Sequence, residues 1–398
     1  MAGSIADECA DFLTIIGRVS FDCSHRAEHG SAVCLTACPT RAETGGFRFA
    51  RVEREGDLPP ANRRIVDVAL LDMHHGWPNL GHEAIADVIQ SAVCDLREPL
   101  ARAGLSVRAI SYDVRRGHAL PEPPGGRHAI YVGTGGPGHL DPRCNDGRDG
   151  SQGIVENPAW EEPLFALFDA IREDRRASLF AICHSFGVMC RWLGVADAVL
   201  RGPEKGGKSS GIRHNQLSAE GRRHPWFARF ARGLRDGGRF PVLDNRLYDL
   251  LPTGSAAPDV RVLAVECDED GHPGDAVTMI DIEDESRGGV PRILGVNHHP
   301  EIVNRQRQLA LLEKKRARGG FNEEWFAERW AALTQPVDDE PDDSVLHLTS
   351  SYTLMGPLRA ALYREVRLRG EALGIDPGFD ERDLPLVYSV EHAAVRPD

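Results

Sequence analysis

The sequence predicts a three-layer α/β sandwich around a mostly parallel sheet, with an N-terminal extension and a C-terminal helical appendage. Three observations lead to this fold class. Short apolar runs bounded by polar residues alternate with helix-compatible stretches from residue 65 to about 200. Closely spaced β-rich runs follow them. The length of 398 residues suits one larger domain of about 250 residues with appended segments.

The first elements are assigned in chain order. Residues 1–63 lack a sustained period and are expected to be an extension that precedes the main domain, residues 64–335. The run from Ile65 to Met73 is apolar throughout, as a buried parallel strand is. A helix is expected over 82–103 and strands over 106–114 and 128–136, which is how an α/β sheet begins.

The middle of the chain brings a cysteine to a structural junction. A helical pattern over 160–173 leads into the apolar strand from Ser178 to Cys183, and the next stretch, 186–200, is helix-compatible. Cys183 therefore follows a strand and precedes a helix. The β-rich runs beyond it suggest an antiparallel or mixed flank of the sheet, and they span residues 239–250, 260–268, 276–282 and 292–300.

The last third of the sequence is expected to be helical. Glu301 opens an amphipathic stretch that reaches about Arg318, and a second helix is expected over 322–334. The remainder, residues 336–398, consists of an acidic linker and a helical appendage, whose main helix is expected over 358–373.

Composition narrows the classes of partner and compartment. The 60 acidic residues exceed the 47 basic ones and give a net charge of −13, which opposes binding to nucleic-acid phosphates. No apolar run is long enough to span a membrane, and the acidic start lacks the pattern of a signal peptide, so we expect a soluble, cytoplasmic protein. The nine cysteines are expected to be free thiols.

We expect neither a metal nor a cofactor. The densest group of possible ligands lacks the paired short spacings of a structural zinc site, and it comprises Cys23, His25, His29, Cys34 and Cys38. His74 and His75 are adjacent on a predicted turn and point apart, so they are more often pocket-lining residues than joint metal ligands.

Cys183 is the candidate nucleophile. A thiol becomes reactive when it is partly exposed and lies near a helix N-terminus, whose dipole and free N–H groups favour the thiolate. A tight strand-to-helix turn also needs small neighbours, and Ala181 and Ser185 meet that need.

Two further segments complete a candidate site. The sequence GTGGPG, from Gly133 to Gly138, ends a predicted parallel strand, where open α/β sheets place their ligands. Gly135 lies in this loop, and the backbone N–H groups of Gly136 and His184 are the candidate oxyanion donors. In NHHPEI, His299 and Glu301 are two residues apart and face the same side, so that the carboxylate can orient the imidazole as a general base.

The ordered motifs GTGGPG, AICHSFG and GVNHHPE resemble those of class I glutamine amidotransferases, over about residues 65–335. The opening LLDMHHGWPNLG resembles the first strand and turn of GMP-synthase-like members. The resemblance implies a flavodoxin-like α/β fold and a triad of Cys183, His299 and Glu301. It also implies L-glutamine as the substrate and an ammonia-accepting synthase as a partner.

The elbow departs from the family pattern Gly-x-Cys-x-Gly-x-Gln, because Ala181, Ser185 and Gly187 stand at its Gly, Gly and Gln positions. Gly187 stands where these amidotransferases have a Gln that helps to hold glutamine. Three alternatives therefore stay open: hydrolysis of another γ-glutamyl amide, a non-catalytic binding or regulatory protein on the same fold, and a serine α/β-hydrolase. In the last, CHSFG resembles the G-x-S-x-G elbow, and Ser185 attacks.

Two other segments have competing interpretations. GPEKGGKS, from Gly202 to Ser209, has the spelling of a phosphate-binding loop but no following apolar helix, so a surface loop that can close over the active site is favoured. The aromatic residues of WFAERW, from Trp325 to Trp330, are interpreted as packing.

Overall fold

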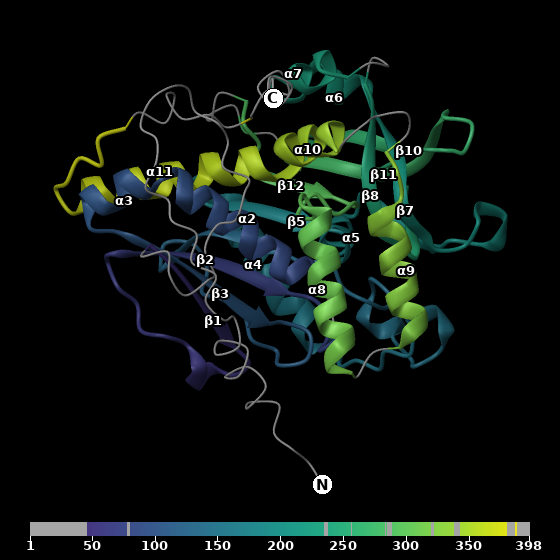
Figure 1. Cartoon of the computed structure of the whole chain (residues 1–398), viewed down its shortest axis with the longest axis horizontal. Coiled ribbons are helices and arrows are strands. Elements are labelled where there is room, and N and C mark those ends of the chain that lie inside the picture. The colour runs from purple at the N-terminus through teal and green to yellow at the C-terminus, as the bar shows by residue number, and fades with distance from the viewer. Residues whose placement is uncertain are drawn as a thin grey trace, which may run out of the picture.

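The computed structural model describes residues 46–77, 80–234, 238–255, 257–282, 284, 289–319, 322–337, 343–379 and 387. Within them, one large sheet of ten strands dominates the molecule (Figure 1). Its order is β1-β3-β2-β4-β5-β12-β11-β10-β7-β8. The parallel part contains β1 (Phe47–Val52), β3 (Ser106–Asp113), β2 (Ile65–Asp72), β4 (His128–Gly133), β5 (Ser178–Ile182) and β12 (Ile293–Val296).

The flank beyond β12 is antiparallel, as the clustered β-rich runs predict. It consists of β11 (Pro273–Ile282), β10 (Val260–Cys267), β7 (Ser209–Leu217) and β8 (Arg239–Arg246). A separate antiparallel pair joins β6 (Ala196–Leu200) to β9 (Tyr248–Pro252). The sheet thus has a parallel half that ends in β12 and an antiparallel half that begins at β11.

Two helical layers cover the sheet, so the predicted three-layer α/β sandwich is confirmed. One layer contains α2 (Gly81–Asp95), α3 (Arg97–Ala103), α10 (Ser344–Ser350) and α11 (Gly356–Ala372). The other contains α4 (Glu161–Glu173) and α5 (His184–Leu193). Side chains of β2 alternate between the layers: Val68 and Leu70 pack under α2 and α11, whereas Leu71 packs under α4 and α5.

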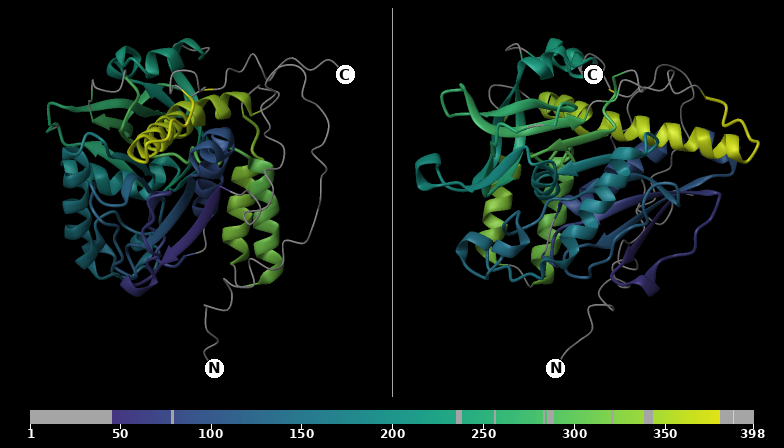
Figure 2. Two further views of the ribbon diagram at one scale, coloured as in Figure 1. Left: turned by 90° about the vertical axis from the view of Figure 1, so that its left-hand side faces the viewer. Right: turned by 180° about the vertical axis from the view of Figure 1, so that it is seen from behind.

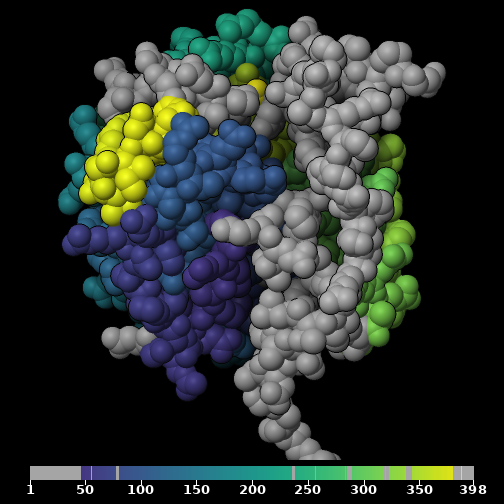
Figure 3. Space-filling model, turned by 60° about the vertical axis from the view of Figure 1, so that its left-hand side comes forward, coloured from purple at the N-terminus to yellow at the C-terminus, as the bar shows by residue number. Residues whose placement is uncertain are grey.

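The C-terminal helices are part of this sandwich. Figure 3 shows α11 beside α2 and α3 on the surface of the molecule. An ion pair joins Arg359 of α11 to Asp95 of α2, with Nε and Oδ2 3.0 Å apart, and Leu362 and Tyr363 are buried in the shared core. The segment expected to be an appendage therefore supplies one face of the main core.

Besides the unpredicted strand β7, the elements differ from the sequence prediction at four other places. Phe47–Val52, within the expected extension, forms the edge strand β1. The helix over 82–103 is two helices, α2 and α3, that meet at Leu96. Gly194, with φ of 65°, ends α5, so the stretch 196–200 is strand β6. Residues 1–45 lie outside the described residues.

The fourth difference concerns the helix expected from Glu301. The helix α8 (Arg305–Arg318) begins four residues later, because the side chain of Asn304 accepts a hydrogen bond from the N–H of Arg307 at 2.9 Å. It forms a hairpin with α9 (Glu323–Thr334), and the two helices lie side by side (Figure 2). A small apolar cluster, which includes Ile212, Leu243, Leu312 and Phe326, holds this hairpin to β7 and β8.

Two short helices, α6 (Ala219–Arg223) and α7 (Phe227–Arg232), follow β7.

Candidate active site

Three predicted segments leave the sheet at one edge because their strands are parallel neighbours. In the register, Gly133 of β4 lies opposite Ala181 of β5, and Ile182 lies opposite Val296 of β12. The glycine loop, Cys183 and the NHHPE segment therefore follow adjacent strands. The N–H of Cys183 donates to the carbonyl of Val296 at 2.8 Å, and this bond joins the turn at Cys183 to the strand that precedes the NHHPE segment. Carboxyl ends of parallel strands are where open α/β sheets bind ligands.

Cys183 occupies a strained turn between β5 and α5. Its φ is 50° and its ψ is −102°, a conformation that costs a non-glycine residue about 1–3 kcal/mol. The side chain is partly buried, and its Sγ lies 3.9 Å from the carbonyl oxygen of Asn245. Directly after it, α5 begins at His184. The thiol thus lies at the N-terminus of a helix, as the sequence predicts.

Ser185 faces away from the site. Its Oγ accepts a hydrogen bond from the N–H of Ile182 at 2.8 Å and donates to the carbonyl of the same residue at 3.0 Å. The side chain is buried, and a Cβ on Gly133 would lie 2.5 Å from its Oγ. This hydroxyl closes the turn, and its two hydrogen bonds oppose its use as a nucleophile.

The glycine loop lies against both neighbouring segments. A Cβ on Gly135 would lie 3.0 Å from Cε1 of His299 and 3.9 Å from Sγ of Cys183, so the imidazole and the sulfur share one side of this residue. A Cβ on Gly136 would lie 2.2 Å from the carbonyl oxygen of Met73. Only glycine fits at the second position without movement of the backbone.

A buried arginine fixes this loop. Nη1 of Arg115 donates to the carbonyls of Met73 and Pro137 at 2.8 Å and 2.7 Å, and the guanidinium pairs bidentately with Glu156 at 2.6 Å and 2.8 Å. Both side chains are fully buried, and removal of one partner from such a pair costs about 3–5 kcal/mol. The sequence motifs do not include Arg115, whose signal is only that it follows a buried strand.

The N–H groups of Gly136 and His184 have no backbone acceptor among the described residues. His184 is the first residue of α5, where helical N–H groups have no partner within the helix. Both residues line one cavity together with Cys183. Two free backbone donors near a thiol are what an oxyanion intermediate needs.

His299 and Glu301 form the predicted pair. Nδ1 of His299 lies 2.9 Å from Oε1 of Glu301, whose side chain is fully buried. Burial alone lowers the pKa of the imidazole, but the Glu301 carboxylate and the Cys183 sulfur outweigh it and raise this pKa well above its usual value. Nε2 of His299 is buried without a hydrogen-bond partner in the described part of the chain and is the nitrogen left for proton transfer.

The neighbouring His298 has the opposite environment. Its Nε2 lies 3.2 Å from Oγ1 of Thr353, which precedes α11 in the helical layer that also contains α10. Burial, together with the nearby His299 and Arg246, lowers the pKa of His298 to about 3. The alternation of an extended segment thus sends one imidazole into the core and the other into the site.

A cavity of about 560 Å³ opens between two walls. We call the first the strand-end wall, and it consists of Gly135, Gly136, Cys183, His184 and His299. The second, here the α9 wall, comes from the residue before β7, from β8 and from α9, and it consists of Lys208, Asn245, Trp325, Glu328 and Arg329.

Sequence reasoning missed most of the α9 wall. Nη1 of Arg329 donates to Oδ1 of Asn245 at 2.6 Å, and its guanidinium lies 5.4 Å from the centroid of the Trp325 ring. Nζ of Lys208 lies 2.6 Å from Oε1 of Glu328. The interpretation of WFAERW as packing alone is therefore incomplete, although Phe326 and Trp330 do stack on each other. Two signals were available: Lys208 in the glycine-rich segment expected to lie in a loop near the site, and the segment from Leu243 to Pro252, which contains Asn245 and stands where the resembling family often has a substrate-side loop.

The position of the missing Gln is occupied from another element. A Cβ on Gly187 would lie 2.4 Å from Cδ1 of Leu140, which lines the cavity. Leu140 therefore fills the space that a longer side chain at 187 would need. The cavity presents an apolar surface there in place of an amide.

His74 lines the cavity, and Asp72 and Thr134 hold its ring. Nδ1 of His74 lies 2.9 Å from Oδ1 of Asp72 and 3.1 Å from Oγ1 of Thr134. His75, with φ of 54°, is not among the lining residues. The two rings do not meet at one metal. The group from Cys23 to Cys38 lies outside the described residues.

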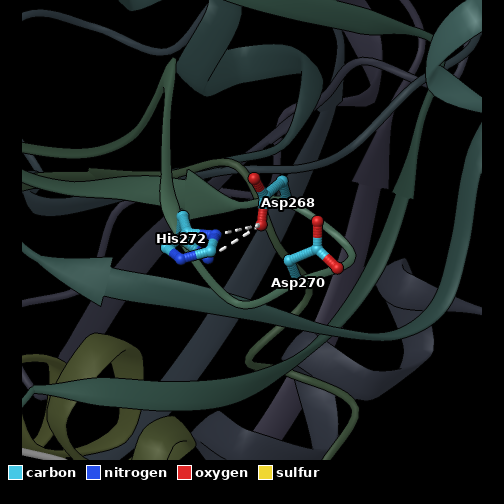
Figure 4. Close-up of side chains that lie close together, drawn as sticks. All are labelled: Asp268, Asp270 and His272. Atoms are coloured by element: carbon cyan, nitrogen blue, oxygen red, sulfur yellow. Dashed lines mark hydrogen bonds and ion pairs between the residues drawn. The ribbon is translucent and has the colours of Figure 1, made fainter.

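Another cluster, Asp268, Asp270 and His272, has ligand atoms close enough for a metal ion, as Figure 4 shows. All three side chains are exposed at the turn between β10 and β11. The N–H of His272 donates to Oδ1 of Asp268 at 2.7 Å, and the N–H of Asp268 donates to the carbonyl of His272 at 2.9 Å. These contacts are accounted for by the geometry of the turn.

No described helix combines the length and the apolar character that crossing a bilayer requires. No protein-family model matches the sequence, and no curated protein does either. Solved glutamine amidotransferases are among its structural neighbours. The one from Thermotoga maritima has a TM-score of 0.44 at 16% identity, and the match covers 75% of this chain and 98% of that one.

A glutamine amidotransferase from Methylobacillus flagellatus has a TM-score of 0.38 at 11% identity, with coverage of 77% of this chain and 95% of that one. A putative GMP synthase subunit from Thermoplasma acidophilum has a TM-score of 0.34 at 11% identity, with coverage of 59% and 85%.

Proposed function

We propose that this chain is a cysteine hydrolase of the glutamine amidotransferase type, which releases ammonia from a carboxamide, most simply the side chain of L-glutamine. One observation carries the proposal. Cys183 has a positive φ and lies at a helix N-terminus, and the buried carboxylate of Glu301 orients the imidazole of His299. The sulfur and the imidazole lie on the same side of Gly135.

In the first half-reaction, the thiolate of Cys183 attacks the carbonyl carbon and forms a C–S bond, and the N–H groups of Gly136 and His184 receive the negative oxygen. The oxyanion collapses and breaks the C–N bond. The leaving nitrogen takes a proton from Nε2 of His299, so that ammonia departs and a thioester remains.

In the second half-reaction, water attacks the thioester and gives a proton to His299. The C–S bond breaks, the acid leaves, and Cys183 returns as a thiolate beside the imidazolium. The net change is amide plus water to carboxylic acid plus ammonia. Glu301 keeps Nδ1 of His299 protonated and Nε2 directed at the reaction throughout.

Ammonia release from glutamine by the wild type and by Cys183→Ser tests the proposal, together with mass-spectrometric detection of Cys183 trapped by a glutamine-like electrophile. We expect Cys183→Ser to lose activity by about 10⁴-fold or more. Ser185→Ala is the matched control, because it removes the neighbouring hydroxyl and should lower stability while the chemistry persists. Loss of turnover in Ser185→Ala alone would support the serine-hydrolase alternative instead.

Leu140 occupies the space beside Gly187 that a Gln side chain would need, and this favours a second candidate function, hydrolysis of a different amide by the same triad. Trapping of Cys183 without ammonia release from glutamine would support it, and absence of trapping would support a binding protein. The family resemblance also implies a synthase that accepts the ammonia. Activation of ammonia release by a co-purifying synthase would support that partner.

A further inference from the structure

The α9 wall carries more positive than negative charge toward the cavity. Lys208 and Arg329 share a single carboxylate, Glu328, whose Oε1 lies 2.6 Å from Nζ of Lys208 and 3.4 Å from Nη1 of Arg329. The other acid of α9 that lines the cavity, Glu324, is exposed and forms no ion pair with either cation. One cationic charge is therefore left without a paired anion on this wall.

A second cationic group at the cavity is balanced. Arg246 belongs to a network in which three cations meet three carboxylates, and its members are Arg201, Lys205, Arg246, Asp244, Asp249 and Glu266. The contrast identifies Lys208 and Arg329 as the place where the cavity lacks an anion. Partly buried charges of this kind are screened less than surface charges.

This place lies close to the thiol. Asn245 contacts both groups: its carbonyl oxygen lies 3.9 Å from Sγ of Cys183, and its Oδ1 accepts from Arg329. One residue thus separates the nucleophile from the guanidinium. When the carbonyl carbon of a ligand lies at the thiol, a second group only a few bonds from that carbon is therefore within reach of Arg329.

Other parts of the cavity indicate where the ligand is recognised. The side chain of Leu140, which lines the cavity beside Gly187, offers no polar group to a ligand. Asn297 is 4% exposed and lines the cavity, and its Nδ2 has no hydrogen-bond partner among the described residues. It is a further donor for an acceptor-rich ligand.

We propose that the substrates are net-anionic carboxamides whose carboxylate binds between Lys208 and Arg329 while Cys183 attacks the amide. This inference rests on the proposed function and narrows its substrate class. The ammonium group of L-glutamine balances its carboxylate, so glutamine is the simplest amide for the reaction, and amides without that ammonium group are expected to bind more tightly. A carboxylate suits the site because a guanidinium donates to it with charge-assisted hydrogen bonds and an ammonium adds a point charge.

The test compares two alkylating reagents, iodoacetate and iodoacetamide, which react with the same thiol and differ by one negative charge. Their rates at Cys183 are followed by mass spectrometry of the full chain, and exposed Cys144 in the same molecule is the reference thiol. Any effect of a substitution on the thiol itself is common to both reagents and cancels in the ratio of their rates.

We expect the iodoacetate-to-iodoacetamide ratio to be about tenfold higher at Cys183 than at Cys144, and to fall about three- to tenfold in Lys208→Met and in Arg329→Met. Glu328→Gln should raise the ratio, because it removes the shared carboxylate. Arg307→Met is the matched control: it removes the same charge from the α8–α9 hairpin, where Arg307 pairs with Asp87, and it should leave the ratio unchanged.

The two possible failures have different signatures. Equal ratios in the wild type, Lys208→Met and Arg329→Met, with Cys183 still alkylated, would overturn the substrate class and leave the nucleophile standing. Protection of Cys183 from both reagents would overturn the nucleophile, and with it the substrate class.

Discussion

The two walls of the cavity are built by different means. Each member of the strand-end wall lies within three residues of the end of a parallel strand. Cys183, Gly136 and His299 meet because β4, β5 and β12 are adjacent. In the α9 wall, Asn245 and Arg329 are 84 positions apart and belong to different elements. The comparison teaches that neighbouring parallel strands bring Cys183 and His299 together, whereas long-range packing of the α8–α9 hairpin places the charges of the second wall.

The difference predicts separate phenotypes. Changes in the strand-end wall should lower the rate of the chemical step, and changes in the α9 wall should weaken binding of the anionic substrate. Three substitutions test this division, beyond the replacement of Cys183 and the comparison of reagents.

The largest of the three effects is expected from Glu301→Gln. Loss of the carboxylate removes the group that orients His299, and kcat for ammonia release should fall by about 10³- to 10⁴-fold. The same loss lowers the pKa of the imidazole, which Glu301 now raises, so the ring gives up its proton at a lower pH. The alkaline limb of the pH–rate profile should therefore move toward acid.

His298→Asn is the control for this shift. The pKa of His298 is already low, about 3, so the ring is neutral through the physiological range. Its replacement disturbs the contact with Thr353 and should lower the melting temperature without moving the alkaline limb. An unmoved limb in Glu301→Gln would contradict the assignment of His299 as the titrating group.

Gly136→Ala should have the next largest effect. The new Cβ would lie 2.2 Å from the carbonyl of Met73, so the loop must shift and its N–H leaves the oxyanion. We expect a loss of about 10²- to 10³-fold in kcat with little change in KM. Gly56→Ala is the matched control, since a Cβ there meets nothing within 4 Å. Activity close to wild type in Gly136→Ala would exclude this N–H from the reaction.

The smallest effect is expected from Arg329→Met, in the α9 wall. Steady-state kinetics on a net-anionic amide should show KM raised about tenfold and kcat within a factor of about three. A neutral amide should show neither change. A fall in kcat with KM unchanged would place Arg329 in the chemistry and remove the distinction between the walls.

Several features were predictable because they depend on short-range patterns. The strand from Ser178 and the turn at Cys183 follow from an apolar run that ends in small residues, and the His299–Glu301 pair follows from alternation in an extended segment. The start of α8 was not predicted, because Asn304 competes with Glu301 as the first capping residue and the structure uses Asn304.

The sequence by itself determined the strands β2, β3, β4, β5 and β12 and which residues meet at their carboxyl ends. Tertiary structure alone decided that Leu140 occupies the space beside Gly187, that Arg115 holds the glycine loop, and that Lys208 and Arg329 line the same cavity as the thiol. The physical reason is range. Periodicity and turn chemistry act over a few residues, whereas cavity shape and local charge are set by packing between segments far apart in the chain.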